Sequence, residues 1–477
     1  MNSVRLMTVL AIDQGTSATK AIVVADDGTV LGLAEVAIDV RTATDGGVEL
    51  LPQQLWDSVV AAGEQALAAA GRPSLTAIGL ANQGETVMAW DRASGRADGP
   101  AIVWQDRRSG VVCDRLADHG SRLAQITGLE LDPYFVAPKI AWLRERVDPG
   151  LTITTTDTWL LHRLCGAFVT DVATAGRTLL LELETCAWSE EACTIFGIDP
   201  ATLPAVVGNA TALGDCTAFG ASVPVTGACV DQQAALFAEG CHTAGEAKCT
   251  YGTGAFMLAC TGATPTRSSN GLVGCPAWKL ADEVTWCLDG QVYTVGAAIG
   301  WLIAMGIMAE PADLDRLGGA VTDSGGVTFV PALAGLAAPY WKPGAKAAFA
   351  GMSLGTERGH LVRAAIDGVA AQVALLAQAA GRDLGAPLTR LRVDGGLTRS
   401  KTLLQVQADL LQFPVEVYPS PHATALGVAG FAAIGASGAA PTSGWGPSAV
   451  VEPAISPEEA TERLERWRAV ADATMDL

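Results

Sequence analysis

One pattern occurs twice in the chain: an extended apolar run, a turn rich in Gly, Thr and Ser, and a second extended run. The first copy runs from Leu6–Ile12 through Asp13–Lys20 to Ala21–Ala25. The second approaches through Lys248–Thr253 and continues as Phe256–Ala259. Because each copy is a complete strand, turn and strand unit, the repeat predicts a duplicated α/β core. We expect a boundary near residues 240–246, which gives domains 1–242 and 243–477.

The tips of these two units have a composition suited to phosphate. Backbone N–H groups and hydroxyls at such a turn can surround phosphate oxygens, while the acid before the first turn, Asp13, can face a metal ion. An ordinary polar hairpin is the alternative for this segment. A second acid, Asp231, precedes the second turn and is followed by Gln232 and Gln233. An acid that can accept a proton from a hydroxyl, placed near a phosphate-binding turn, indicates phosphoryl transfer.

The composition limits the class of protein. A chain of 477 residues with 49% hydrophobic and 17% charged residues predicts a globular protein, and two large α/β domains are our working count. The net charge of −19 argues against nucleic-acid or anionic-membrane partners. Eleven cysteines without a C-x-x-C pair favour reduced thiols in the cytoplasm. We expect neither a signal peptide nor a membrane span.

Polar clusters follow two predicted strands in the first half. Leu75–Leu80 leads to Asn82-Gln83-Gly84-Glu85-Thr86, and Ala101–Val103 leads to Trp104-Gln105-Asp106-Arg107-Arg108. Strand ends in an open α/β sheet are where small ligands bind. We therefore expect Glu85 to hold hydroxyls of a polyhydroxylated ligand and Trp104 to cover its C–H face. Arg107 and Arg108 are expected to form surface or structural ion pairs.

Helical patterns separate the strands. They are expected at Gln53–Ala70, within Gln291–Met308 from about Gly296, at His360–Gly381, at Ser400–Leu411 and at Ala423–Gly438. Small residues near Gly296 would let a nucleotide approach the backbone. The region from Thr170 to Leu180 is assigned no direct role, because a packed strand with a structural Arg177 explains it as well as a lid over the substrate region does.

Seven short blocks, in order along the chain, resemble the glycerol kinase branch of the FGGY carbohydrate kinases. They are Asp13-Gln14-Gly15-Thr16, Trp104-Gln105-Asp106-Arg107-Arg108, Leu131-Asp132-Pro133-Tyr134-Phe135, Thr156-Asp157-Thr158-Trp159-Leu160, Asp231–Phe237, Thr250-Tyr251-Gly252-Thr253-Gly254 and Val393-Asp394-Gly395-Gly396. The resemblance implies an α/β fold of two duplicated actin- and hexokinase-like (ribonuclease H-like) domains. ATP and substrate would occupy the interdomain cleft.

The resemblance also implies roles for individual residues. Asp231 would be the catalytic base; an acid that only caps the following helix is the alternative. The substrate-binding residues would be Glu85, Trp104, Tyr134, Asp231, Gln232 and Phe256. The ATP-binding residues would be Thr16, Ser17, Lys20, Thr253, Gly296, Gly395, Gly396 and Ser400. Asp13 would hold Mg²⁺, so ATP and Mg²⁺ are the expected cofactors.

The chain departs from that branch at four positions. Gly84 stands where the pattern has an arginine that binds a substrate hydroxyl, so a donor is lost and volume is gained. Ala18 replaces a common serine, Lys20 replaces an arginine, and Gly300 replaces a glutamine of the adenine region. Lysine can still neutralise phosphate as a point charge.

The expected reaction is ATP-dependent phosphorylation of a primary hydroxyl of a small polyol or sugar, with glycerol to glycerol 3-phosphate ranked first. The alternatives are a kinase of a larger polyol or ketose (tetritol, pentitol or xylulose-like), a binding-only homologue, and an actin- or chaperone-like ATPase. The resemblance implies a homodimer or homotetramer. Regulation by a sugar bisphosphate is not expected, because no arginine lies between Arg177 and Arg267.

Overall fold

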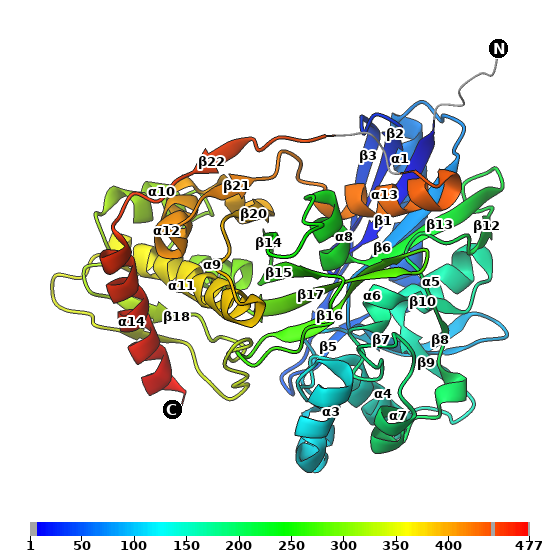
Figure 1. The fold of residues 1–477 in the computed structure, drawn as a ribbon, viewed down its shortest axis with the longest axis horizontal. Coiled ribbons are helices and arrows are strands. Elements are labelled where there is room, and N and C mark those ends of the chain that lie inside the picture. The colour runs from blue at the N-terminus through cyan, green and yellow to red at the C-terminus, as the bar shows by residue number, and fades with distance from the viewer. Residues whose placement is uncertain (1–6, 440–443, 476–477) are drawn as a thin grey trace.

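The computed structural model describes residues 7–439 and 444–475, which form two α/β lobes, each built on a twisted sheet (Figure 1). The first sheet has the strand order β12 (Gly214–Cys216), β13 (Val223–Val230), β6 (Ala77–Asn82), β1 (Thr8–Gln14), β2 (Ala18–Ala25) and β3 (Val30–Ala37). The second has the order β16 (Val273–Leu280), β17 (Glu283–Val292), β15 (Ala255–Gly262), β14 (Ala247–Tyr251), β20 (Leu391–Asp394), β21 (Val415–Val417) and β22 (Ala449–Val451).

The two sheets share one plan, which confirms the predicted duplication. In the first, β1 pairs antiparallel with β2 and parallel with β6. In the second, β14 pairs antiparallel with β15 and parallel with β20. Central strands of this kind are covered on both faces and are therefore apolar throughout, as the fully buried Leu10 and Ile12 of β1 illustrate.

The first phosphate-type turn is tighter than expected. The sequence predicts a turn over Asp13–Lys20, but β1 continues to Gln14 and β2 begins at Ala18. The N–H of Gly15 donates to the carbonyl of Ala18 at 3.0 Å, which closes the hairpin. Lys20 therefore lies on a strand directly opposite Asp13 and not at the tip.

A smaller sheet and several helices complete the first lobe. The smaller sheet has the order β4 (Arg41–Thr42), β5 (Val48–Leu50), β8 (Arg96–Ile102), β7 (Val87–Asp91) and β9 (Thr152–Thr155); β10 (Val169–Asp171) pairs with β11 (Ala205–Val207). The helices are α1 (Pro52–Ala69), α2 (Gly110–Arg115), α3 (Gly120–Thr127), α4 (Val136–Arg144), α5 (Thr156–Cys165), α6 (Val172–Ala175), α7 (Glu190–Phe196) and α8 (Asp231–Ala238). The strand predicted from Thr170 to Leu180 is wrong beyond Asp171, because the Asp171 carboxylate caps α6 by accepting the N–H groups of Ala173 and Thr174.

The second lobe carries the remaining elements. Its helices are α9 (Gly296–Ala304), α10 (Asp313–Arg316), α11 (Arg358–Leu384), α12 (Lys401–Leu411) and α14 (Pro457–Thr474), with the strand pair β18 (Thr328–Val330) and β19 (Ala348–Ala350). Helix α9 begins at Gly296, as predicted, but ends at Ala304 and not at Met308. Helix α11 is long and apolar enough to cross a membrane, but it is mostly buried in the second core, as a core helix is.

One helix from the end of the chain returns to the first lobe. Helix α13 (Ala423–Ser437), orange in Figure 1, lies beside β1, β13 and α8. Its Val428 and Ala432 pack with Val9 and Ala11, and a Cβ on Gly79 would come within 2.7 Å of the Val428 carbonyl oxygen. The predicted domain boundary at residue 242 stays a prediction. Residues 1–6, 440–443 and 476–477, which belong to the two predicted domains, lie outside the described residues.

Candidate active site

Three neighbouring parallel strands of the first sheet end at one edge. Gln14 of β1, Asn82 of β6 and Val230 of β13 are paired in register, so the residues around and beyond them gather at the same place. A cavity of about 160 Å³ lies there. It is lined by Thr16, Ser17, Gly84, Glu85, Trp104, Tyr134, Arg177, Val230, Asp231, Gln232, Gln233, Thr250, Gly252, Thr253, Phe256 and Asp289. All six predicted substrate-binding residues are therefore brought together.

Asp231 is the first residue of α8 and faces this cavity. Its pKa is raised to about 7, mainly by burial and also by the carboxylates of Asp13 and Glu85, while Lys248 acts in the opposite direction. A carboxylate with a pKa near neutrality is suited to accept a proton from a hydroxyl. The helix-cap alternative is not supported, because the N-cap of α8 is Val230 and the Asp231 carboxylate accepts only the adjacent N–H of Gln232, at 2.7 Å.

Aromatic side chains form one wall of the cavity. Trp104 contacts Tyr134 and Phe256 edge to face, with ring centroids 5.9 and 5.8 Å apart. The indole N–H of Trp104 donates to the Thr16 hydroxyl at 2.9 Å, which fixes the ring. The fully buried Lys139 donates to the carbonyls of Pro133 and Tyr134, and so holds the segment that carries Tyr134. This wall can cover the C–H face of a polyol.

A buried ion-pair network adjoins this wall, since the Arg177 guanidinium lies 5.8 Å from the centroid of the Tyr134 ring. The Arg177 guanidinium donates from Nε to Glu85 at 2.6 Å and from Nη1 to Asp289 at 2.8 Å. Burial raises the pKa of Glu85, and Arg177 opposes that rise. Glu85 also has a φ of +52°, an uncommon backbone conformation found at functional sites. The sequence patterns did not predict that Arg177 and Asp289 line the cavity. The apolar residues 179–181 that follow Arg177 indicate a buried segment, in which an arginine needs an ion-pair partner.

Two buried charged side chains of the second lobe lie next to residues that line the small cavity. Lys248 of β14 donates to the Gln232 side-chain oxygen at 2.6 Å and to the Thr250 hydroxyl at 2.7 Å. The Gln232 oxygen is therefore committed to Lys248, which leaves its amide NH₂ for a ligand. Asp394, at the end of β20, is paired in register with Thr250, and burial raises its pKa. Sequence reasoning assigned no role to Lys248 or Asp394.

Asp13, near the end of β1, is the residue predicted to hold Mg²⁺. Its pKa is raised to about 6, mainly by burial; Lys20 lowers this pKa, and the carboxylates of Glu35 and Asp394 raise it. Within residues 7–439 and 444–475 no three His, Cys, Asp or Glu side chains are grouped to hold a metal. Mg²⁺ usually takes one or two carboxylates and fills its octahedral shell with water and phosphate oxygens. Asp13 therefore fits such an ion when nucleotide is present.

A cavity of about 1150 Å³ in the second lobe meets the small one at Gly252 and Thr253. Of the predicted ATP-binding residues, Thr253, Gly296, Gly396 and Ser400 line it, together with the apolar Ile299, Ile303 and Leu314. Thr16 and Ser17 line the small cavity instead. A turn shared by both cavities can hold the phosphate that passes between them.

Glycines let the backbone close around this larger cavity. A Cβ on Gly296 would lie 2.6 Å from the Gly252 carbonyl oxygen. Gly395 has a φ of +96°, and a Cβ there would lie 2.4 Å from the Tyr251 carbonyl oxygen. The Ser400 hydroxyl donates to Asp315 at 2.8 Å and caps α12, so it shapes the wall.

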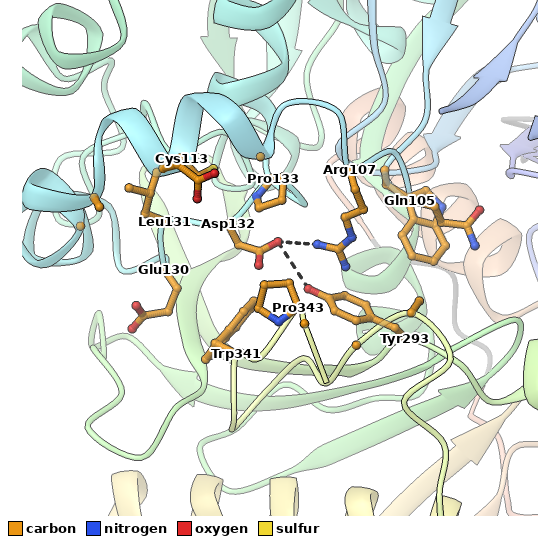
Figure 2. Close-up of a pocket in the computed structure, with 18 of the residues that line it drawn as sticks. Gln105, Arg107, Cys113, Glu130, Leu131, Asp132, Pro133, Tyr293, Trp341 and Pro343 are labelled. Carbon is orange, nitrogen blue, oxygen red and sulfur yellow. Dashed lines mark hydrogen bonds and ion pairs between the residues drawn. The ribbon is translucent and has the colours of Figure 1, made fainter. Parts of the chain in front are cut away.

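A third cavity, of about 1170 Å³, opens between the lobes next to Trp104 (Figure 2). Figure 2 shows Arg107 and Tyr293 converging on Asp132; Arg107 lies 2.8 Å from that carboxylate and stacks 4.3 Å above the Tyr293 ring. Arg108 pairs with Asp106 at 2.6 Å. The prediction that both arginines form ion pairs is confirmed.

The chain is similar to known kinases over almost its whole length. The FGGY family of carbohydrate kinases matches residues 8–238 with its N-terminal domain and residues 247–436 with its C-terminal domain. The chain is 43% identical to a glycerol kinase of Thermus brockianus over 444 residues, 90% of each chain. It is 39% identical to a glycerol kinase of Bordetella parapertussis over 486 aligned positions, 96% of each.

Solved structures give the same result for the fold. The structure resembles a Plasmodium falciparum glycerol kinase with ADP, with a TM-score of 0.88, 29% identity and 98% of both chains covered. A xylulose kinase from Rhodospirillum rubrum gives a TM-score of 0.84 at 24% identity, again over 98% of both chains, which shows a shared fold.

Proposed function

The chain belongs to the FGGY family of carbohydrate kinases, and from this premise we propose that it transfers the γ-phosphoryl group of ATP to a primary hydroxyl of a small polyol. Glycerol to glycerol 3-phosphate is the first reaction to test, because curated relatives at about 40% identity are glycerol kinases. The observation that supports the proposal most is the meeting of the two cavities at Gly252 and Thr253, with Asp231 inside the smaller one.

The reaction needs a nucleophile, a proton acceptor and neutralisation of charge. The hydroxyl oxygen forms a bond to the γ-phosphorus, the bond to the bridging oxygen breaks, and ADP leaves. The hydroxyl proton passes to the Asp231 carboxylate, whose pKa of about 7 suits that transfer. Lys20 and the backbone N–H groups of the two turns stabilise the phosphate charge. Bound by Asp13 and the nucleotide, Mg²⁺ would supply further charge neutralisation.

A coupled ADP-release assay tests the proposal. ATP with glycerol should release ADP, and ATP alone should release almost none; phosphorus NMR should then identify a phosphomonoester on a primary carbon. ATP consumption that is independent of any polyol would favour the actin- or chaperone-like ATPase. Polyol binding without ADP release would favour a binding-only homologue.

The proposal also covers the cellular compartment and the oligomeric state of the enzyme. A kinase that draws on ATP, has a small-molecule substrate and keeps all eleven cysteines free fits the cytoplasm. We propose a homodimer or homotetramer, which sedimentation at several protein concentrations would resolve.

A further inference from the structure

Lys248 of β14 is fully buried and holds two residues that line the small cavity. Its ammonium donates to the side-chain oxygen of Gln232 at 2.6 Å and to the hydroxyl of Thr250 at 2.7 Å. Thr250 lies two residues further along the same strand, whereas Gln232 lies on α8 of the first lobe. One buried lysine therefore connects two residues of the cavity that come from different lobes.

The chemistry of a lysine decides which end of the Gln232 amide faces it. A lysine ammonium has three N–H donors and no acceptor, whereas an amide has an oxygen that accepts and an NH₂ that donates. The amide can therefore meet Lys248 only with its oxygen, because the reversed amide would bring two donors together. The partner thus fixes the orientation of a group whose two ends have nearly the same shape.

Carboxylates around Lys248 compensate its positive charge. Burial raises the pKa of each of four nearby carboxylic acids, and Lys248 opposes that rise in every one of them. The four are Asp231, Glu239, Asp289 and Asp394. An ammonium buried without opposite charges would be costly, so these surroundings favour the form of the lysine that only donates.

The other end of the Gln232 amide is left for a ligand. Gln232 is half-buried and lines the cavity. Among the residues that the structure describes, its side chain bonds only to Lys248, and its NH₂ nitrogen is not one of the buried atoms that lack a partner. That nitrogen is therefore accessible and keeps both of its donors. The backbone N–H of Gln232 donates to Asp231, so this amide directly follows the proposed base.

We propose that Lys248 is a positioning residue of the reaction, which turns the NH₂ of Gln232 toward the substrate and so makes the enzyme select a hydrogen-bond acceptor at that point. This inference rests on the proposed kinase function and specifies how the polyol is recognised. A hydroxyl of the polyol can accept from this NH₂. Because Lys248 and Gln232 belong to different lobes, the donor is oriented only while the lobes stay in this arrangement.

Neutral analogues of glycerol show which end of the amide the substrate meets. In 2-fluoro-1,3-propanediol and 3-fluoro-1,2-propanediol, fluorine replaces one hydroxyl; it is similar in size, accepts a hydrogen bond weakly and cannot donate one. We define the fluoro ratio as kcat/KM for an analogue divided by kcat/KM for glycerol. A change in stability or in the pKa of Asp231 lowers both rates alike, so the ratio reports the hydrogen bond to the ligand.

Replacement of the lysine tests the positioning role. Lys248→Met releases the Gln232 amide, whose oxygen can then turn to the ligand; the oxygen accepts from a hydroxyl but repels fluorine. The fluoro ratio should therefore fall by about tenfold for at least one of the two analogues. Lys279→Met is the control, because this half-buried lysine of β16 lines none of the three cavities, and it should leave the ratio unchanged. An unchanged ratio for both analogues in Lys248→Met would overturn the inference.

A second variant keeps the buried lysine and its partner. Gln232→Glu still accepts from Lys248 with one oxygen, but presents an oxygen in place of the NH₂ to the ligand. The fluoro ratio should again fall by about tenfold or more, and the thermal stability should stay close to that of the wild type. If Lys248→Met does not fold, this variant decides alone, and a fluoro ratio equal to that of the wild type contradicts the assignment.

A binding measurement separates this inference from the proposed function. Calorimetric titration with glycerol and with each fluoro analogue, without nucleotide, should give the same pattern of affinity ratios in the wild type, Lys248→Met and Gln232→Glu. If no polyol supports ADP release, the proposed function fails, and these affinities still decide the role of Lys248. Equal affinity ratios in all three proteins, or no binding of glycerol to the wild type, would reject that role.

Discussion

Burial sets the protonation of the carboxylates that gather at the strand ends. Asp13, Glu85 and Asp231 are drawn out of bulk water and toward one another, and the pKa of each is raised. A raised pKa has no consequence for an acid with a purely structural role. It suits a catalytic base, which must accept a proton and release it again near neutral pH. We propose Asp231 as the base because, although Glu85 and Asp231 both line the small cavity, the Glu85 carboxylate is paired with Arg177.

Replacement of that base should abolish most turnover. Asp231→Asn keeps the size of the side chain and removes its proton affinity, so kcat should fall by about 100- to 10,000-fold. ADP affinity, measured by calorimetry, should change little, because the larger cavity does not include residue 231. Turnover within a few-fold of wild type would exclude Asp231 as the base.

The pH profile should report the same group. The carboxylate must be ionised to accept a proton, so activity is present above the pKa of about 7 and is lost as the pH falls through it. Below that value kcat/KM for the polyol should decline about tenfold per pH unit. A profile that stays flat from pH 8 down to pH 5 would contradict the raised pKa.

At the scale of elements, the alternation of strands and helices and the duplicated strand–turn–strand unit were predictable, because burial on both faces imposes continuous apolar runs. The extent of the first turn was not predictable. Asp13 and Lys20 pair across β1 and β2, and only the sheet register reveals it. Arg177 was similarly assigned to a packed strand, since its partner Asp289 lies on β17 of the other lobe and no local pattern connects them.

The glycine turn after β20 should be intolerant of any side chain. Gly395→Ala places a Cβ 2.4 Å from the Tyr251 carbonyl oxygen at a φ of +96°, and should cost about 1–3 kcal/mol of stability or more. It should also weaken ADP binding, since Tyr251 and Gly396 line the larger cavity.

Gly385→Ala is the matched control for that turn. Gly385 also has a positive φ, of +71°, but no atom of a neighbouring residue lies within 4 Å of where its Cβ would stand, and it ends α11 away from the cavity. Its loss of stability should be smaller, and ADP affinity should match that of wild type. Equal losses of ADP affinity in both variants would show that the turn has no specific part in nucleotide binding.

At the scale of the whole molecule, buried charges join the two lobes. Arg177 of the first lobe pairs with Asp289 of the second, and Lys248 of the second donates to Gln232 of the first. Contacts of this kind depend on the relative position of the lobes, and so couple closure to the assembly of the site. The family resemblance predicted an interdomain cleft, whereas the residues that cross it emerged only from the structure.

Removal of the central arginine should destabilise the protein strongly. Arg177→Met leaves Glu85 and Asp289 buried without their cation, and should cost about 3–5 kcal/mol in a chemical denaturation experiment. Arg122→Met, which breaks an exposed pair with Glu191, is the control and should have a much smaller effect. Similar losses in the two variants would argue against a structural role for the buried network.

The most direct test of the account is polyol-dependent ADP release by the wild-type enzyme and by Asp231→Asn, measured side by side with ATP and Mg²⁺. The account predicts that the wild-type enzyme releases ADP only when a polyol with a primary hydroxyl is present, and that the variant releases almost none. ADP release that does not depend on the polyol, or that persists undiminished in Asp231→Asn, would contradict it.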